Sequence, residues 1–436
     1  MHVGSGRFQL WLFGIMAIWL HLPVYAGEYT YRFNLWNETA ATKANRSSPF
    51  NPDNLWLNLE TWSNSLAAAG EASYAPIKQV KFAGAFYNRY DHGKTDTDRL
   101  RLKELYANFS LNSHWDVTAG KRILKWGTGY AWTPTGFLDP PRDPRDPNDR
   151  LSQYEGRELI EVRATYGNHN LTGVFSSPQL FSHLKIGRGL CQWAFKYNAL
   201  VRGLDYSLIA SFGGIHSPNR YGVNATYVVG KALEIHGEAA AQRGSRLLYP
   251  LAIGEDNPAK TYLQPPYARL KEHDGRIYMS TLLGINYTFS SGWNLVAEYY
   301  RDGTGLNLRE WRRLGDYVAF NEEQHRLQAG GDLSQITLPA ANLLWTVQGF
   351  TQFNRHQDYF FTRLSRTRIA RKWDLENITI LNTHDASLIW IPQVSFDFSE
   401  RVGVYVRYSY YAGGRNTEFG SLPFRSVWIL GLAFRL

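Results

Sequence analysis

Alternation of apolar and polar side chains is the feature that most constrains this chain. In residues Tyr29–Trp36, tyrosine, phenylalanine and leucine alternate with threonine, arginine and asparagine, and Val427–Leu436 alternates in the same way. A period of two puts successive side chains on opposite faces of a β-strand. Mean hydropathy is only −0.37, although aromatic residues make up 15% of the chain. The pattern therefore predicts strands with lipid on one face and water on the other, and aromatic residues at the membrane interfaces.

Further segments repeat this period and define the other expected strands. Short turns alternate with longer polar segments between them, which is the usual asymmetry between periplasmic turns and extracellular loops in outer-membrane barrels. The expected fold is all-β, a single transmembrane antiparallel β-barrel of about 18 strands, with 16 to 20 possible. The higher number depends on an extra hairpin at residues 359–367 and 375–381. The remaining expected strands are residues 55–60, 78–87, 100–111, 115–124, 157–166, 192–201, 206–212, 221–229, 233–241, 277–290, 293–301, 388–398 and 402–411.

The first 26 residues have the pattern of a cleaved signal peptide. Arg7 supplies a positive charge, Leu10–Leu22 is a short apolar core, and Val24, Tyr25 and Ala26 fit a cleavage site. The apolar run is shorter than the roughly 20 residues of a spanning helix. We expect cleavage after Ala26, a barrel formed by residues 27–436, and export to the bacterial outer membrane.

Composition and motifs argue against several other classes. The formal net charge of +9 is mild for 436 residues, and no nucleic-acid-binding motif is present. Cys191 is the one cysteine, so no internal disulfide can form, and covalent haem attachment by C-x-x-C-H is excluded. The common hydrolase, metalloprotease and phosphate-loop motifs do not occur. Glu234, His236 and Glu238 share one strand face, but barrel walls often carry polar side chains in this way. We expect no enzyme activity and no cofactor.

The segment Trp126–Glu158 lies between two expected strands and has no alternation. It is rich in Pro, Gly, Asp and Arg, and its length suits a functional loop or a disordered segment. Its aromatic residues and charges of both signs argue against disorder. We expect an ordered loop that folds into the barrel mouth and narrows the pore. The candidate constriction and pore-lining residues are Arg142, Asp143, Arg145, Asp146, Asp149, Arg150, Arg157, Glu161, Arg163 and Arg407.

These charges allow two interpretations that can coexist. One is a transverse electric field that orients solutes, and the other is a set of ion pairs that fixes the loop to the wall. Side chains assigned to the lumen by alternation also have both signs, which predicts weak ion selectivity or an uncharged polar solute. The basic stretch Arg363–Lys372 is expected in a loop, at the membrane rim or in the lumen. It would either bind anionic lipopolysaccharide or substrate, or be a solvated basic loop. The lumen assignments are Lys81, Arg157, Glu161, Arg163, Lys196, Glu234, His236, Glu238 and Arg407.

Four short segments carry a resemblance to known families. The final strand resembles the C-terminal assembly signal of bacterial outer-membrane barrels, although it ends in Leu436 with Phe434 two places before. The segments Gly120–Gly129 and Asp139–Pro144, with Thr417–Gly420 near the end, resemble porin-like families related to alginate-export barrels. The resemblance implies a monomeric barrel of this size that is assembled by the barrel-assembly machinery. It assigns no functional residue.

The favoured function is a porin-like channel for passive diffusion of small polar or charged solutes. One alternative is an export channel for an anionic polysaccharide, which predicts a positive lumen along its whole length. The other is a structural sheath around a multihaem cytochrome, which predicts a wide, empty barrel with the long loop lying aside. The expected surroundings are outer-membrane lipid and lipopolysaccharide, with no nucleic acid.

Overall fold

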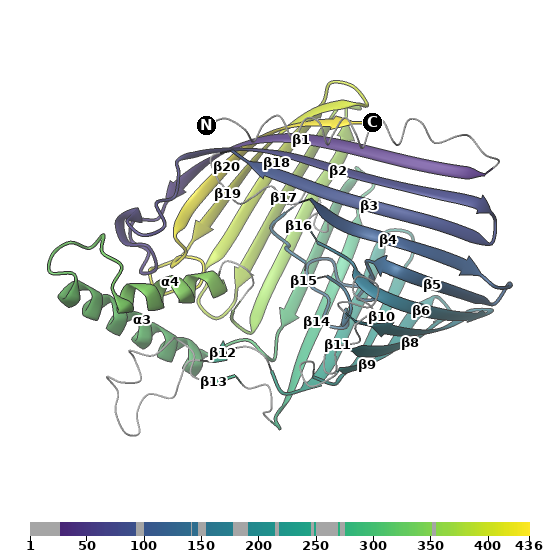
Figure 1. Ribbon diagram of the computed structural model, residues 1–436, viewed down its shortest axis with the longest axis horizontal. Helices are drawn as coiled ribbons and strands as arrows, with labels where there is room; N and C mark the ends of the chain where they lie inside the picture. The colour runs from purple at the N-terminus through teal and green to yellow at the C-terminus, as the bar shows by residue number, and fades with distance from the viewer. Residues whose placement is uncertain are drawn as a thin grey trace.

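The computed structural model describes residues 27–92, 100–140, 142–146, 154–177, 191–213, 218–245, 248–249, 269–270, 275–350 and 355–436. Within them, eighteen strands form one antiparallel sheet, and β1 pairs with both β2 and β20, which closes the sheet into a barrel (Figure 1). The expected all-β barrel of about 18 strands is confirmed. The strands are β1 (Glu28–Ala44), β2 (Trp62–Ile77), β3 (Val80–Asp91), β4 (Arg101–Ser110), β5 (Trp115–Arg122), β6 (Arg157–Tyr166), β7 (His169–Ser176), β8 (Gln192–Val201), β9 (Leu204–Gly213), β10 (Arg220–Val229), β11 (Leu233–Arg243), β14 (Ile277–Thr288), β15 (Trp293–Arg301), β16 (Asp358–Ile369), β17 (Trp373–Asn382), β18 (Leu388–Asp397), β19 (Val402–Ala412) and β20 (Phe424–Arg435).

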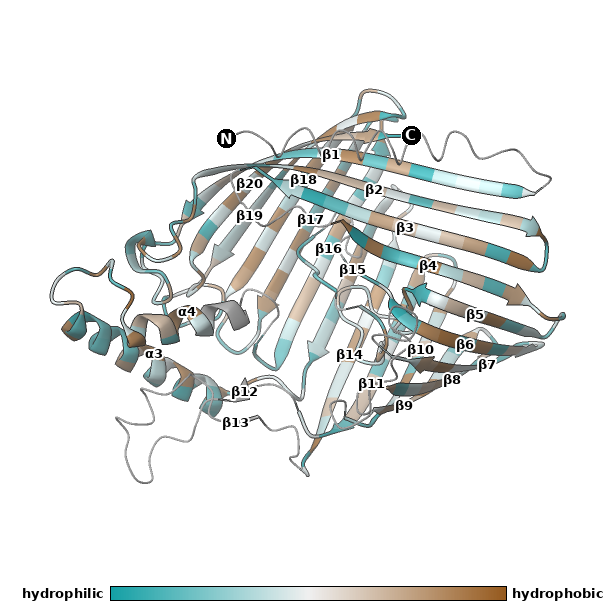
Figure 2. Ribbon diagram, viewed as in Figure 1, coloured by the Kyte–Doolittle hydropathy of each residue, from teal (hydrophilic) through white to brown (hydrophobic). Residues whose placement is uncertain are grey.

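The alternation of side chains gives the barrel an apolar outer surface and an inner surface with both polar and apolar residues. In β6, Ile160 and Val162 are exposed on the outer face, whereas Glu161 between them is buried on the inner face. Leucines at the middle of other strands, such as Leu208 and Leu283, are more than half exposed. Apolar and polar positions succeed one another along the strands (Figure 2). The outer surface therefore suits a hydrocarbon environment. Among the helices of the described residues, none is long and apolar enough to cross a membrane.

Two helices occupy the long connection between β15 and β16, where the sequence predicted a loop. They are α3 (Leu308–Gln328) and α4 (Leu338–Phe350), and they lie at the long-loop end of the barrel (Figure 1). Helix α3 begins at Asn307, whose side chain accepts from Glu310 N while the Glu310 carboxylate accepts from Asn307 N. Asn342 of α4 donates to Asn321 of α3 at 3.0 Å and joins the two helices. A two-stranded sheet, β12 (Leu248–Tyr249) and β13 (Arg269–Leu270), lies in the connection from β11 to β14.

One expected strand is wrong, and two strands, β2 and β7, were not foreseen. Residues 55–60 follow the short 3-10 helix η1 (Pro52–Asn54) and lie in the connection from β1 to β2. Asn51 Oδ1 accepts from Trp56 N at 3.1 Å, and Asn54 Oδ1 accepts from Leu59 N at 2.9 Å. Asparagine side chains thus take backbone donors that a strand ladder would need. Strands β2 and β7 were missed, and together with the hairpin β16–β17 they bring the count to 18.

The basic stretch Arg363–Lys372 lies mainly in a strand rather than a loop. Its first part forms the end of β16, and Arg371 and Lys372 form the short turn to β17. Arg363 faces the lumen, where it pairs with Glu376 of β17. The ion pair and the aqueous lumen spare this arginine the cost of facing lipid.

Candidate functional site

The connection between β5 and β6, residues 123–156, reaches across the inside of the barrel; we call it the central loop. It hydrogen-bonds to inward-facing side chains of β11 and β15 on one side and of β19 on the other. Around the barrel from β6, where the loop ends, β11 is reached after four intervening strands. Around the barrel in the other direction, from β5, where the loop begins, β19 is reached after five. A segment that contacts both walls must lie within the lumen, which agrees with its course in Figure 1. Strand β5 ends at Arg122 and β6 begins at Arg157, so the loop is shifted slightly from the expected boundaries.

A buried carboxylate of β11 holds two parts of the central loop. Glu238 is 4% exposed, and one of its oxygens accepts from the amide nitrogens of Thr128 at 2.5 Å and Gly129 at 2.6 Å. The other oxygen accepts from Thr135 N at 2.8 Å and from the Thr135 hydroxyl at 2.7 Å. Hydrogen bonds to a charged group contribute about 1.5–3 kcal/mol each. Glu238 therefore fixes both sides of the turn at residues 129–135.

A second buried carboxylate, Glu298 of β15, holds the tip of that turn. It accepts from Tyr130 N and from Ala131 N, the latter at 2.8 Å. His236 Nε2 of β11 lies 2.8 Å from the same carboxylate. The two residues stand on either side of Gly284 in β14, where a Cβ atom would come within 2.2 Å of His236 Nε2. A glycine at this position thus permits the contact between β11 and β15.

Inside the central loop, Asp139 organises the backbone. Its carboxylate accepts from Trp126 N at 2.8 Å and from Gly127 N at 3.1 Å. Burial raises the pKa of Asp139 to about 6, against the opposing effect of these hydrogen bonds. Arg142 donates to the carbonyl oxygens of Gly129 and Tyr130. The described part of the loop, residues 123–140, 142–146 and 154–156, therefore has its own internal bonds.

Two apolar clusters attach the central loop to the wall. Trp132 stacks on Tyr300 of β15, with ring centroids 4.9 Å apart, and lies edge-on to Phe361 of β16. This first cluster continues over the inner faces of β17 and β18 and includes residues of α3 and α4. The second cluster packs Trp126 and Phe137 of the loop against inner faces of β6–β9 and β11. Together the clusters line the inner faces of β6–β9, β11 and β15–β18 and reach Tyr411 of β19.

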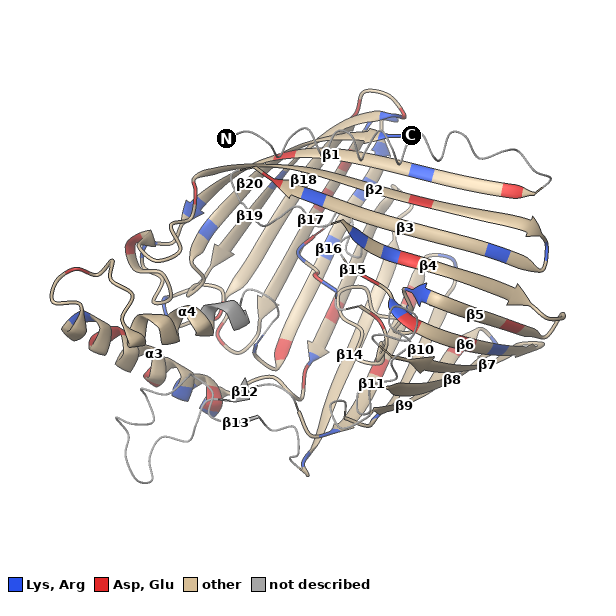
Figure 3. Ribbon diagram, viewed as in Figure 1, with Lys and Arg blue, Asp and Glu red and all other residues tan. Residues whose placement is uncertain are grey.

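The remaining wall carries a charged row near the seam where β20 meets β1. On β19, Arg407 reaches Asp146 of the central loop at 3.3 Å. Tyr405 of the same strand donates to Glu38 of β1, and Arg89 of β3 lies 3.5 Å from Glu38. Strands β1 and β3, beside the seam, carry both acidic and basic residues (Figure 3). We call Glu38, Arg89, Tyr405 and Arg407 the seam row.

The structure connects the predicted charged residues mostly in pairs. Within the loop, Arg145 binds Asp143 through two hydrogen bonds of 2.8 and 2.9 Å. On the wall, buried Glu161 accepts from Arg163 at 2.7 Å and from Arg122 at 3.0 Å. The remaining predicted residues divide as follows: Arg142 binds loop carbonyls, Asp146 binds Arg407, Arg157 donates to Gln192 at 3.2 Å, and Asp149 and Arg150 lie outside the described residues.

Sequence reasoning missed Glu298 and did not predict that Glu238 and His236 help to hold the loop. Alternation along β15 could have placed Glu298 in the lumen, but nothing in the sequence pairs it with His236. Glu238 was assigned to the lumen only as part of a polar strand face. Across the described part of the chain, no group of three or more His, Cys, Asp and Glu side chains is arranged to hold a metal ion. The Glu234–His236–Glu238 pattern instead serves the loop, through His236 and Glu238.

Comparisons with known proteins were made at the level of sequence and of structure. No protein-family model and no curated protein matches the chain. Among solved structures, OccK8 (OprE) of Pseudomonas aeruginosa has a TM-score of 0.54 at 10% identity, covering 94% of this chain and 98% of that chain. OccK11 (OpdR) of the same species has a TM-score of 0.53 at 9% identity, covering 94% and 96%. OccAB1 of Acinetobacter baumannii has a TM-score of 0.52 at 10% identity, covering 95% and 97%.

These similar structures are outer-membrane porins with an 18-stranded barrel. At such low identity the similarity establishes a shared fold. The porin-like resemblance expected from the sequence is thereby confirmed for the fold, whereas the narrower resemblance to alginate-export barrels receives no support from these structures.

Proposed function

We propose that this protein is a bacterial outer-membrane channel for passive diffusion of small polar or charged solutes, and that the central loop narrows its pore. The observation that carries the proposal is the course of the loop from its roots at β5 and β6 to strands across the lumen, where it is held by Glu238 of β11, Glu298 of β15 and Arg407 of β19. The apolar outer surface supports a membrane location. In this proposal residues 1–26 are a signal peptide, residues 27–436 the mature barrel, and the last strand the signal read by the assembly machinery.

The open path is proposed to lie off the barrel axis. Apolar clusters and the loop itself occupy the wall from β6 to β18, and on β19 the inward side chains Tyr405 and Arg407 are buried, so water has access mainly along β1–β5. Solutes on this path pass the seam row and Asp146 of the loop. Of the predicted residues, we assign Asp146 and Arg407 to the constriction and Glu161 and Arg163 to the adjoining wall. We assign Arg142, Asp143 and Arg145 to fixing the loop.

The charges along this path favour weak ion selectivity. Arg89 lies within 3.5 Å of Glu38 and 2.8 Å from Asp91, and Arg407 lies beside Asp146. Rings of one sign set strong selectivity in channels, and neighbouring charges of both signs do not form such a ring. The path would therefore pass small polar solutes of either charge.

The two alternative functions are less consistent with these observations. An export channel for an anionic polysaccharide needs a positive lumen, but the basic side chains of the seam row have acidic neighbours. A sheath around a cytochrome needs an empty barrel, but the central loop crosses the lumen and is bonded to both sides. We therefore propose neither polysaccharide export nor a haem-protein partner, and no catalytic role.

Planar-bilayer recording of the purified protein tests both parts of the proposal. We expect single-channel conductance for the wild type and a several-fold larger conductance when residues Trp132–Asp149 are deleted. A second variant, Glu238→Gln with Glu298→Gln, keeps the loop but weakens its attachment, and should give larger or more variable conductance. Glu234→Gln is the matched control, because Glu234 lies on the same face of β11 and contacts only His236 among the described ion pairs, at 3.5 Å. A wild type without conductance refutes the channel, and unchanged conductance in both variants refutes the constriction.

A further inference from the structure

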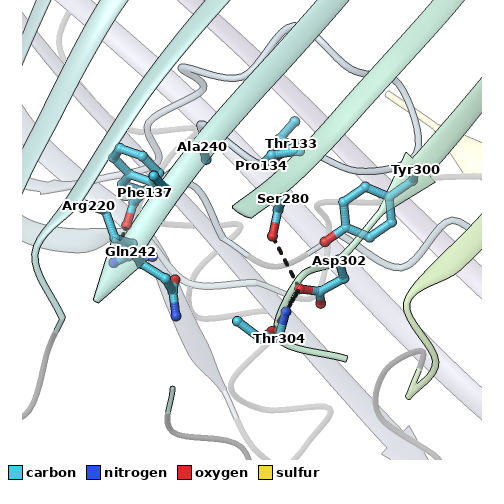
Figure 4. A pocket seen from close by; sticks show the side chains of 12 residues that line it. Thr133, Pro134, Phe137, Arg220, Ala240, Gln242, Ser280, Tyr300, Asp302 and Thr304 are labelled. Atoms are coloured by element: carbon cyan, nitrogen blue, oxygen red, sulfur yellow. Dashed lines mark hydrogen bonds between the residues drawn. The ribbon is translucent and has the colours of Figure 1, made fainter. Parts of the chain in front are cut away.

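A polar pocket of about 200 Å³ lies between the central loop and the strands β10, β11, β14 and β15 (Figure 4). Arg220 is the first residue of β10, Gln242 is near the end of β11, and Asp302 directly follows β15. All three lie at the end of the barrel that carries the long connections. A solute that enters from this end meets the pocket beside the loop, before it reaches the seam row.

One wall of the pocket is a rigid acidic group. Asp302 Oδ1 accepts from Thr304 N at 2.9 Å and from the Thr304 hydroxyl at 2.7 Å. The Ser280 hydroxyl lies 3.2 Å from the same oxygen. Figure 4 shows Ser280, Tyr300 and Asp302 grouped on one side of the pocket. Hydroxyl groups there can both donate and accept, so they can exchange partners when a solute arrives.

The opposite wall carries donors and an amide. Arg220 donates to the carbonyl oxygen of Phe137 at 3.2 Å, and its guanidinium lies over the Phe137 ring, 5.1 Å from the centroid. Gln242 donates to the carbonyl oxygen of Gly244 at 2.9 Å, which fixes its amide in place. Both side chains are held by the protein itself and need little ordering to bind a solute.

The lining is complementary to a ring that has polar edges and apolar faces. It combines one guanidinium, one carboxylate, one amide and several hydroxyl groups with the aromatic rings of Phe137 and Tyr300. The two formal charges cancel, so the pocket does not favour a solute of either net charge. A sugar ring presents hydroxyls around its edge and C–H groups on its faces, and these match the polar groups and the aromatic rings respectively.

The volume agrees with one such ring. The pocket volume is about 200 Å³. Pockets for drug-sized ligands are larger, from about 300 Å³. An oligosaccharide could therefore occupy the pocket with one ring only.

We propose that this pocket is a binding subsite for one neutral sugar ring, placed on the long-loop side of the constriction. The role of the subsite in transport rests on the proposed channel function, whereas the binding itself does not. A zwitterionic amino acid would also place opposite charges against Arg220 and Asp302. The sugar is favoured because Asp302 Oδ1 already interacts with hydroxyl groups of Ser280 and Thr304, which sugar hydroxyls can replace without loss of charge balance.

Equilibrium binding to the purified protein in detergent tests the proposal without requiring transport. Glucose and maltose would be titrated in a calorimeter, with glycine and succinate as the zwitterionic and anionic probes. We expect saturable binding of the sugars in the millimolar range and no saturable binding of the other two. Gln242→Leu and Ser280→Ala should each weaken sugar binding about tenfold. Asn108→Ala, a change on β4 away from the pocket, should leave the binding unchanged.

The outcomes separate this inference from the channel proposal. Saturation by glycine without saturation by sugar would overturn the sugar assignment, and so would sugar binding that survives both pocket variants. An absence of binding by a protein that still conducts ions would overturn the subsite and leave the channel intact. Sugar binding by a protein that does not conduct would support the subsite and refute the channel.

Discussion

At two places in the barrel wall, a glycine on one strand lets side chains of the two flanking strands contact each other across it. His236 contacts Glu298 across Gly284 of β14. Tyr405 contacts Glu38 in the same manner, across Gly431 of β20, where a Cβ would come within 2.1 Å of the Tyr405 ring. Both contacts are polar and face the lumen. Each glycine therefore determines which side chains can form a hydrogen bond two strands away.

Gly284→Ala should destabilise the barrel by about 1–3 kcal/mol, the usual cost of overpacking. The new methyl group would collide with His236 Nε2 and displace it from Glu298. Chemical unfolding in detergent, followed by circular dichroism, measures this change. Gly237→Ala is the matched control in the neighbouring strand, because its Cβ would lie 3.6 Å from Leu282 O, an ordinary contact. Equal stability of the two variants would show that the gap over Gly284 is not required.

Among the elements, the strands were largely predictable and the connections were not. Each strand has a period of two because its faces meet different surroundings, and this pattern is local enough to read from the chain. Residues 55–60 do not form a strand because the side chains of Asn51 and Asn54 accept hydrogen bonds from backbone amides five residues away. Helix α3 did carry a local signal, the capping pair Asn307 and Glu310, but this signal was overlooked.

The candidate site was predictable in its location and not in its contacts. Length and composition predicted that the central loop lies in the lumen, and ion pairing was one of the two interpretations of its charges. The carboxylates that hold it, Glu238 and Glu298, belong to strands far along the chain, and their partners are mainly backbone amides. Backbone amides are the same in every residue, so no sequence pattern identifies which ones a distant carboxylate will bind.

A buried carboxylate also joins the connections at the long-loop end. Glu418, between β19 and β20, accepts from Arg355 N, from the Tyr359 hydroxyl and from the Asn382 amide, each at 2.7 Å. Burial raises the pKa of Glu418 to about 7. Burial also lowers the pKa of nearby His356 to about 4, so protonation of this histidine opposes folding as the pH falls below 6.5.

Glu418→Gln should remove a pH dependence of stability. Because the pKa of Glu418 is raised in the fold, its favourable contribution is present below pH 4.5 and is lost as the pH rises through about 7. The variant imitates the protonated acid, so it should equal the wild type at pH 4.5 and exceed it by roughly 3 kcal/mol above pH 8. Thermal unfolding of both proteins over this pH range measures the difference in their stability. His356 is present in both proteins, so its effect cancels in this difference. A difference that stays constant with pH would contradict the prediction, and Glu400→Gln in an exposed turn is the control.

At the scale of the whole molecule, the destabilisation caused by an arginine on the outer surface should depend on its depth in the membrane. Leu208 and Leu204 lie on the same face of β9, at its middle and at its short-turn end. An arginine facing lipid costs about 2–4 kcal/mol at the bilayer midplane and about 0–1 near the interface. Leu208→Arg should therefore destabilise the protein in lipid vesicles much more than Leu204→Arg. Equal effects of the two substitutions, measured by reversible unfolding in those vesicles, would argue that this face does not cross hydrocarbon.

The ladder between β1 and β20 has a consequence for how the protein is made. It joins strands from opposite ends of the sequence, and pairing of such distant segments is slow because a large loop must close first. Until it forms, both strands present unpaired backbone that could instead pair with another copy of the chain. Newly synthesised molecules must therefore be kept apart from one another during their passage to the membrane, and crowding before insertion is the stage at which this protein is most prone to aggregate.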